Sequence, residues 1–183
     1  MRLVLTSLIT AVAATAWPAH AGGVLVKDRP EAAARASLAV TSTAFANGGV
    51  IPVRHSGDGA NRAPPLAWTP AKGAASYVVI VEDPDAPAPA PFVHWLAWNI
   101  STPGLPEGGA AAGVAHGRNG FGSTGYGGPR PPPGAAHHYH FEVFALDGGA
   151  KTPAPGADRK ALVAALRGHV LAKGDLVGTF QRR

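Results

Sequence analysis

The segment from Ser76 to Ile100 reads SYVVIVEDPDAPAPAPFVHWLAWNI, and it indicates the fold class more clearly than any other part of the chain. Two short apolar runs, Ser76–Glu82 and Val93–Ile100, lie on either side of a proline-rich stretch. Runs of this length that alternate with turn signals are typical of β-strands. Because proline has no N–H group for a sheet hydrogen bond, the stretch between the runs must be a connection. The segment therefore predicts two successive strands.

The same alternation of short apolar runs and turn-rich pieces continues on both sides of this segment. Four further runs are candidate strands: Leu38–Thr43, Val50–Arg54, Tyr139–Leu146 and Leu176–Phe180. The chain contains 24 glycines and 18 prolines, which favour many turns and few long helices. These patterns predict a mainly β domain.

One helix is expected near the C-terminal end of the chain. Asp158 is a suitable N-cap, and the apolar residues Leu162, Leu166 and Val170 follow at intervals of four. Gly174 comes next as a stop signal. Four-residue spacing places these apolar side chains on one face of a helix, so the helix is predicted to pack against a sheet.

The first 21 residues resemble a signal peptide. Arg2 provides a positive charge, Leu3–Ala16 is uncharged and mostly apolar, and Ala19-His20-Ala21 matches the pattern of a cleavage site. The apolar run is short for a membrane span, and no later segment replaces it. We therefore expect cleavage after Ala21, a periplasmic or secreted protein and no stable membrane anchor. Residues 22–37 are predicted to lead into one domain over residues 38–183.

Composition excludes several functional classes. The 183-residue chain has a formal net charge of +5 and no cluster of basic and aromatic residues, so nucleic-acid binding is not expected. Without cysteine it has no disulfide, thiolate metal ligand or cysteine nucleophile. Gly120, Gly122 and Gly125 spell G-x-G-x-x-G, but prolines follow where a dinucleotide-binding fold needs a helix. No cofactor is expected.

Polar residues gather at the ends of the predicted strands. Asp83 and Asp85 follow the first run, His94 begins the second, and His137 and Tyr139 begin a later one. Strand alternation places His94 on the face of Leu96, Trp98 and Ile100, and Tyr139 on the face of Phe141 and Val143. Imidazole and phenol groups on apolar faces need polar partners. These residues alone are compatible with a buried polar cluster, an anion or small-ligand pocket, or a metal site.

Several motifs, taken together and in order, resemble the phosphatidylethanolamine-binding protein family, and the match is closest to its bacterial Raf-kinase-inhibitor-like branch. The motifs are Pro64–Trp68, Asp83–Pro87, His94-Trp95, Gly117–Gly134, His137–Asp147, Gly168–Leu171 and Leu176–Phe180. The resemblance covers about Leu38–Gln181. It implies a large central antiparallel sheet packed on a smaller sheet, with a helix near the C-terminus.

The resemblance also implies a small pocket for anions and phosphoryl headgroups at one end of the large sheet. Its ligand-binding residues would be Asp83, His94, His137, Tyr139, Gly128 and Pro131. Its supporting residues would be Pro84, Asp85 and Trp95. The two imidazoles and the phenol would donate hydrogen bonds to the anion, and backbone N–H groups of the glycine-rich loop could join them. No catalytic residue and no metal ligand belong to this set.

The expected function is therefore that of a secreted, non-enzymatic protein that binds a small anionic or phosphoryl-containing ligand. One alternative is an inhibitor or modulator of a protein partner of the protease or kinase type. Another is a hydrolase with His94 or His137 as general base. A homodimer is compatible with all three.

Overall fold

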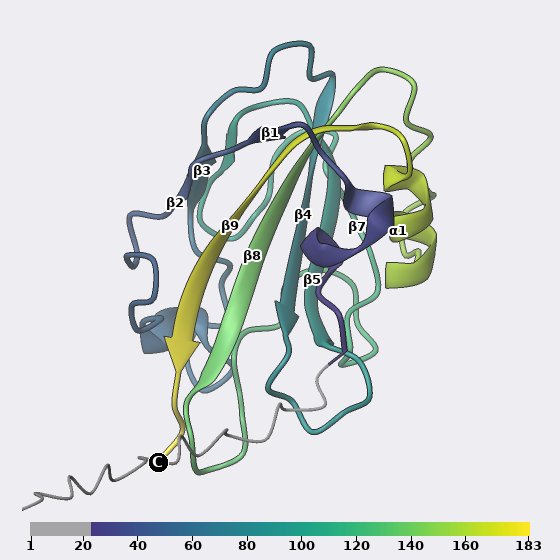
Figure 1. The fold of residues 1–183 in the computed structure, drawn as a ribbon. Coiled ribbons are helices and arrows are strands. Elements are labelled where there is room, and N and C mark those ends of the chain that lie inside the picture. Colours follow the sequence, from purple (N-terminus) through teal and green to yellow (C-terminus); the bar gives the residue numbers. More distant parts are fainter. Residues whose placement is uncertain (1–22) are drawn as a thin grey trace, which may run out of the picture.

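Two β-sheets and one α-helix form the part of the chain that the computed structural model describes, residues 23–183 (Figure 1). The predicted signal peptide, residues 1–21, lies outside the described residues. The larger sheet has six strands in the order β1-β9-β8-β4-β5-β7, and only the edge pair β1–β9 is parallel. The smaller sheet has three strands in the order β2-β3-β6. This architecture confirms the predicted mainly β fold class.

The strands of the larger sheet include the four longest in the described chain. They are β1 (Ala36–Ser37), β4 (Ser76–Asp83), β5 (Phe92–Ile100), β7 (Ala115–His116), β8 (His137–Leu146) and β9 (Val170–Phe180). The strands of the smaller sheet are β2 (Val40–Thr41), β3 (Leu66–Trp68) and β6 (Gly104–Leu105). The helical elements are α1 (Arg159–Leu166) and the 3-10 turns η1 (Val26–Asp28), η2 (Pro30–Ala32) and η3 (Val53–His55).

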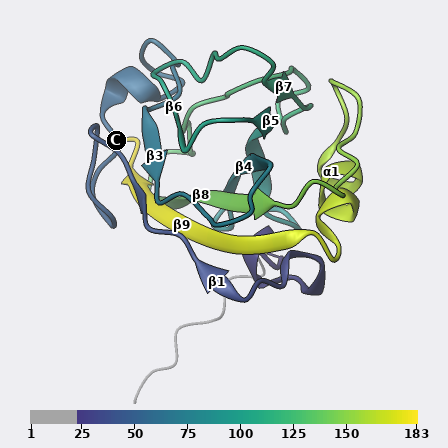
Figure 2. The same ribbon diagram turned by 90° about the horizontal axis from the view of Figure 1, so that it is seen from above.

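The larger sheet is covered on both faces, and this creates two cores. One face packs against the smaller sheet, and the buried side chains there include Val79, Trp95 and Phe141. The other face packs against α1 and the N-terminal segment, with Leu96 and Leu162 among its buried side chains. The view from above shows the smaller sheet and α1 on opposite sides of the molecule (Figure 2). Coverage on both faces explains why the central strands are apolar nearly throughout.

The predicted lead-in, residues 22–37, is packed against the domain from Gly23 onward. Val26 and Ala32 are fully buried in the core below α1, and β1 pairs with β9. The sequence of this segment is polar and rich in alanine, and it has no periodicity that indicates an element. Short 3-10 turns leave no periodic pattern. Within residues 23–183, no helix is long and apolar enough to cross a membrane.

The predicted helix begins where expected but ends earlier. The Asp158 carboxylate caps it by accepting a hydrogen bond from the Ala161 N–H at 2.9 Å. The helix ends at Leu166, because Gly168 adopts a φ of +79° and turns the chain. Val170, expected on the helical stripe, instead begins β9. The prediction that the helix extends to Gly174 was therefore wrong.

The prediction of a strand over Val50–Arg54 was also wrong. Val50 makes a single bridge with Thr179, and η3 follows from Val53. Pro52 lies between them and has no N–H group with which to continue a ladder. Three candidate strands of the larger sheet are confirmed with ends shifted by one or two residues. The fourth, Leu176–Phe180, is confirmed as the second half of β9, which begins at Val170.

Two β-bulges in β5 change which face its side chains occupy. The pairing with β4 shifts between Val81 and Glu82 and again between Tyr77 and Val79. Trp95 pairs with Val81 and Val93 pairs with Glu82, so His94 is the extra residue of the first bulge. The prediction that strict alternation places His94 with Leu96 and Trp98 was therefore wrong, since those two residues belong to the core below α1.

Candidate functional site

A pocket of about 190 Å³ opens at the end of the larger sheet where β4 ends and where β5 and β8 begin. It lies between these strand ends and two loops, residues 84–91 and 117–136. The residues that line it are Asp83, Ala86, Pro87, Phe92, His94, Phe121, Arg130, Pro131, Pro132, His137 and Tyr139. The structure thus brings together five of the six predicted ligand-binding residues, although they come from distant parts of the sequence.

Asp83 and His137 form the central polar pair of the pocket. The Oδ2 atom of Asp83 lies 2.7 Å from Nδ1 of His137. Its Oδ1 atom accepts hydrogen bonds from the backbone N–H groups of Asp85 and Ala86 at 2.8 and 3.1 Å. Pro84, which lacks an N–H group, begins this turn. Because a carboxylate only accepts hydrogen bonds, Nδ1 of His137 carries the proton and Nε2 is the ring atom left for a ligand.

His94 is held in a similar way by the backbone. Its Nδ1 atom donates to the Gly127 carbonyl oxygen at 2.6 Å, and the Gly127 N–H donates back to the His94 carbonyl oxygen at 2.8 Å. The side chain is almost completely buried. Burial lowers the pKa of His94, because the charged ring is removed from water. A neutral ring bound in this way presents Nε2 as an acceptor, so this atom donates to an anion only after protonation.

Tyr139 supplies a hydroxyl group that is buried and has no hydrogen-bond partner in the described part of the chain. Its ring packs edge-on against His94, with centroids 5.0 Å apart. Burial, and after it the negative charge of Asp83, raises the pKa of Tyr139. The hydroxyl therefore keeps its proton. A buried donor without an acceptor is rare in folded proteins and indicates a group that a ligand could satisfy.

The glycine-rich loop does not direct its predicted N–H groups into the pocket. The Gly128 N–H donates to Oδ1 of Asn61 at 2.6 Å, and Gly128 lines a neighbouring hollow rather than the pocket itself. Pro131 does line the pocket. We therefore correct the expectation that Gly128 belongs to the lining, because its N–H group is already bound by Asn61, a residue outside the loop.

The supporting residues Asp85 and Trp95 lie outside the pocket lining and hold the elements around it. The Oδ2 atom of Asp85 accepts from both the backbone N–H and the Nδ1 atom of His138, at 2.7 Å each, and so ties the loop after β4 to the start of β8. Although partial burial opposes the effect, the hydrogen bonds from His138 hold the pKa of Asp85 below its usual value. Trp95 lies behind the pocket in the core between the sheets, where its Nε1 atom donates to His116 at 3.2 Å.

Two aromatic residues of the lining were not predicted. Phe92 and Phe121 pack on each other with ring centroids 4.8 Å apart, and both contact the His94 ring. The alternation of strand residues could have indicated Phe92, which lies two positions before His94. No sequence signal indicates Phe121, whose position depends on Asn119, since the Asn119 Oδ1 atom accepts from the Phe121 N–H at 3.0 Å.

Arg130 lies at the rim, between the pocket and the neighbouring hollow. Its Nε atom is 3.2 Å from Oδ1 of Asp58, and more than half of the side chain is exposed. An exposed ion pair of this kind contributes little to stability. The guanidinium is therefore a source of positive charge at the mouth of the pocket rather than a structural anchor.

The pocket can offer hydrogen bonds of two kinds. With neutral rings it presents the Tyr139 hydroxyl as donor and the two imidazole Nε2 atoms as acceptors. After protonation of His94 and His137, the same three atoms are all donors. None of the lining residues is Ser, Thr or Cys. No group of three or more His, Asp or Glu side chains in residues 23–183 is arranged to hold a metal ion.

Comparisons with known proteins identify the family of the chain. Residues 41–181 match the family model described as phosphatidylethanolamine-binding protein. A UPF0098 protein of Pyrococcus horikoshii is 43% identical over 157 residues, which cover 80% of this chain and 78% of that protein. A Mycobacterium tuberculosis relative that carries the name lipoprotein LppC is 39% identical over 148 residues, with 79% of this chain and 72% of that protein covered.

A solved structure shows the same fold. The crystal structure of Escherichia coli YbcL, described as a new member of the mammalian PEBP family, is 32% identical to this chain and superimposes with a TM-score of 0.73. The match covers 81% of this chain and all of YbcL. With a family model that spans most of the chain and relatives of this similarity, the chain belongs to the phosphatidylethanolamine-binding protein family.

Proposed function

We propose that this chain is an exported, non-enzymatic binding protein whose pocket takes a small oxyanion or the phosphoryl headgroup of a larger molecule. The observation that carries the proposal is the unpartnered, buried Tyr139 hydroxyl beside two imidazoles whose Nδ1 atoms are already bound. Once both imidazoles are protonated, a tetrahedral anion would accept from all three groups at once. Charge-assisted hydrogen bonds of this kind are stronger than neutral ones.

Export is supported by the signal-peptide pattern of the first 21 residues. The M. tuberculosis relative that bears a lipoprotein name is consistent with it. A phosphoryl ligand is supported by the family name and by the size of the pocket, about 190 Å³, which suits a headgroup rather than a whole lipid.

The test is a titration with inorganic phosphate and, separately, with O-phosphorylethanolamine, followed by NMR of the His and Tyr side chains. We expect the resonances of His94, His137 and Tyr139 to shift with either ligand. Tighter binding of O-phosphorylethanolamine would indicate a headgroup, and equal binding would indicate a free anion. Spectra that do not change at millimolar concentrations of both compounds would refute the proposal.

A matched pair of variants tests the role of His137. His137→Gln should weaken phosphate binding about tenfold or more, which corresponds to about 1.4 kcal/mol. His169→Gln is the control, because Nδ1 of His169 also lies near a carboxylate, 2.9 Å from Oδ1 of Asp147, but neither residue lines the pocket. Equal effects of the two substitutions would show that the loss is not specific to the pocket.

One observation favours hydrolysis as a second candidate. A carboxylate bound to Nδ1 of a histidine is the arrangement that orients a general base, and Asp83 and His137 have it. Turnover of p-nitrophenyl phosphate that is lost in His137→Gln would support this alternative. The lining contains no Ser, Thr or Cys side chain that this base could activate, so the attacking group would have to be water. We expect no turnover.

A further inference from the structure

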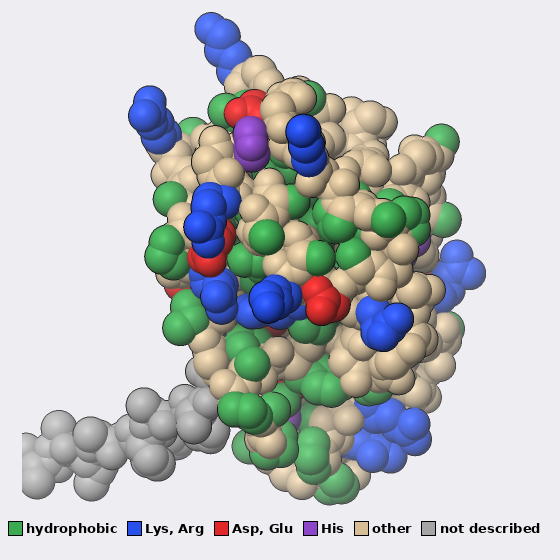
Figure 3. Space-filling model, turned by 90° about the vertical axis from the view of Figure 1, so that its right-hand side faces the viewer, with side chains coloured by type: hydrophobic (Ala, Val, Ile, Leu, Met, Phe, Trp, Pro, Cys, Tyr) green, Lys and Arg blue, Asp and Glu red, His purple; other side chains and the backbone are tan. Residues whose placement is uncertain are grey.

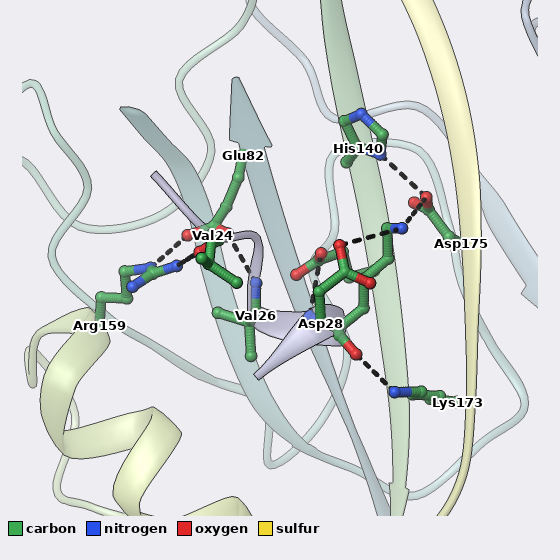
Figure 4. A network of polar contacts seen from close by, with 10 residues as sticks. Val24, Val26, Asp28, Glu82, His140, Arg159, Lys173 and Asp175 are labelled. Atoms are coloured by element: carbon green, nitrogen blue, oxygen red, sulfur yellow. Dashed lines mark hydrogen bonds and ion pairs between the residues drawn. The ribbon is translucent and has the colours of Figure 1, made fainter. Parts of the chain in front are cut away.

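The face of the larger sheet below α1 carries a buried group of polar side chains that the pocket does not use. Glu82 on β4, His140 on β8 and Asp175 on β9 belong to it (Figure 4). Glu142, two residues after His140 on β8, is the fourth member. The side chains of Glu82 and Glu142 are fully buried. In the sheet, Glu82 pairs with His140 and Glu142 pairs with Asp175. Burial of several carboxylates on an otherwise apolar face is costly unless each finds a partner.

The partners come from a short segment at the start of the described chain, residues 23–28, which we call the N-terminal strap. The Val26 N–H donates to Oε2 of Glu82 and the Lys27 N–H donates to Oε1 of Glu142, each at 3.2 Å. The Lys27 ammonium also lies 3.7 Å from Oδ2 of Asp175. The strap thus supplies one contact to each of the three carboxylates.

Two cations of the domain bind the strap in return. Arg159 donates through Nη2 to the Val24 carbonyl oxygen at 3.0 Å and pairs with Glu82, and Lys173 donates to the Lys27 carbonyl oxygen. Figure 3, which views the molecule from the α1 side, shows Lys and Arg side chains gathered on this surface with acidic side chains among them. The strap is therefore held by polar contacts as well as by the buried side chain of Val26. The contacts to Glu82, Glu142 and Asp175 change when one of these carboxylates gains or loses a proton.

The arrangement leaves two carboxylate oxygens without partners. Oε2 of Glu142 and Oδ1 of Asp175 are buried and accept no hydrogen bond from the described residues. Like charges directly opposite each other on paired strands repel. Burial, and after it the negative charge of Glu82, raises the pKa of Glu142. The closed strap is thus most stable when Glu142 is neutral.

The strap also touches the hairpin that carries the ligand pocket. Glu82 directly precedes Asp83, whose carboxylate holds His137. At the start of the strap, a Cβ atom on Gly23 would lie 2.9 Å from the carbonyl oxygen of Pro89, in the connection between β4 and β5. Ala86 and Pro87 of the same connection line the pocket. Figure 1 shows the N-terminal segment descending to this connection.

We propose that the N-terminal strap is a pH-dependent device that closes over Glu82, Glu142 and Asp175 and, when closed, holds the β4–β5 connection and the pocket residues on it in place. Release of the strap hydrates Glu142, so its ordinary acidity returns and it ionises. The closed strap binds more protons at Glu142 than the released strap. Closure is therefore favoured as pH falls and is weakened as pH rises.

The other charged and titratable groups around Glu142 come from four elements of the domain and from the strap. They are Glu82 on β4, His140 on β8, Asp175 and Lys173 on β9, Arg159 on α1, and Lys27 and Asp28 on the strap. Protonation of His140 would place a positive charge beside Asp175, because its Nδ1 atom lies 2.9 Å from Oδ2 of that residue. The test must therefore separate Glu142 from His140.

The test measures hydrogen exchange of the strap amides by NMR on the full chain, as protection factors corrected for the intrinsic effect of pH. In the unsubstituted protein, the protection of the Val26 and Lys27 amides should fall about tenfold or more between about pH 5 and about pH 8. The Asp85 and Ala86 amides, which donate to Asp83, should lose protection over the same pH range. Constant protection of the strap amides would overturn the proposal.

Three substitutions assign the effect. Glu142→Gln, which is neutral at every pH, should keep all four amides protected at about pH 8. His140→Gln should retain the pH dependence. Glu107→Gln is the matched control, since this half-buried glutamate pairs with Arg54 and Arg62 and is not part of the strap contacts. A pH dependence that persists in Glu142→Gln, or disappears in His140→Gln, would overturn the proposal.

These measurements need no ligand, so their outcome is independent of the anion-binding function proposed above. If Glu142→Gln changes the protection of the strap amides but leaves the Asp85 and Ala86 amides unchanged, the strap does not support the pocket and that part of the proposal is wrong. Because the wild-type titration requires no substitution, a variant that fails to fold does not prevent the test.

Discussion

His137 and Asp83 lie 54 residues apart in the sequence, yet Nδ1 of the imidazole is 2.7 Å from Oδ2 of the carboxylate. The pairing joins the end of β4 to the start of β8. It also determines which nitrogen of His137 remains available to a ligand, because the carboxylate requires the proton on Nδ1.

Asp83→Asn should disturb this pair without changing the volume of the side chain. An amide places a donor either against Nδ1 of His137 or against the N–H groups of Asp85 and Ala86. We expect the free energy of unfolding to fall by about 1–3 kcal/mol in urea denaturation, and the ring ¹⁵N shifts of His137 to show its proton on Nε2. Asp147→Asn, at the more exposed His169–Asp147 pair, is the control and should lower the free energy of unfolding by less. A proton that stays on Nδ1 would contradict the prediction.

Tyr139→Phe should separate stability from binding. Removal of a buried hydroxyl without a partner should leave the free energy of unfolding unchanged or raise it by about 1 kcal/mol, while phosphate binds about tenfold more weakly. Tyr126→Phe should lower the free energy of unfolding, because the Tyr126 hydroxyl donates to the His55 carbonyl oxygen at 2.7 Å. It should leave phosphate binding unchanged, because Tyr126 is outside the pocket lining. Urea denaturation and phosphate titration of both variants check this, and equal destabilisation of the two would count against it.

The effect of phosphate on stability should depend on pH through His94. Burial lowers the pKa of His94, so below about pH 6.5 the native protein binds fewer protons at this ring than the unfolded chain, and the free energy of unfolding falls through this group. Phosphate favours the protonated ring and offsets the loss. We expect phosphate to stabilise the protein more at about pH 5.5 than at about pH 7.5 in urea denaturation at constant ionic strength. The opposite order would show that neutral imidazole is the binding form.

Asn119→Ala should loosen the loop that carries Phe121. The Asn119 amide accepts from the N–H groups of Phe121 and Ser123, at 3.0 and 3.2 Å, and donates to the Gly125 carbonyl oxygen at 3.0 Å. Loss of these hydrogen bonds should reduce the free energy of unfolding by about 2–3 kcal/mol, measured by urea denaturation, and should weaken phosphate binding. Asn47→Ala, which removes a single exposed hydrogen bond to the Val177 N–H, should cost about 1 kcal/mol or less. Similar losses in both variants would argue against a special role of Asn119.

Sequence patterns were most reliable where local preference and tertiary pairing agreed. The apolar runs Ser76–Glu82 and Tyr139–Leu146 are strands within a residue or two, because central strands covered on both faces are apolar throughout. The prediction from the apolar pattern was wrong after Leu166, because the residues that follow fit both helical spacing and strand alternation. The segment from Val170 to Phe180 forms a strand, β9, because it pairs with β8 along nearly its whole length. Gly168 turns the chain just before it. Such pairing is not visible in local sequence.

The sequence by itself determined the fold class and the types of side chain in the pocket, since short apolar runs, turn residues and the order of motifs are local properties. The tertiary structure decided how those side chains are used. A bulge in the pairing of β4 with β5 turned His94 toward Tyr139, and distant backbone and carboxylate groups took up the Nδ1 atoms of both histidines. It also brought the strap over Glu82 and Glu142. Each of these depends on register between segments far apart in the chain, which no local pattern records.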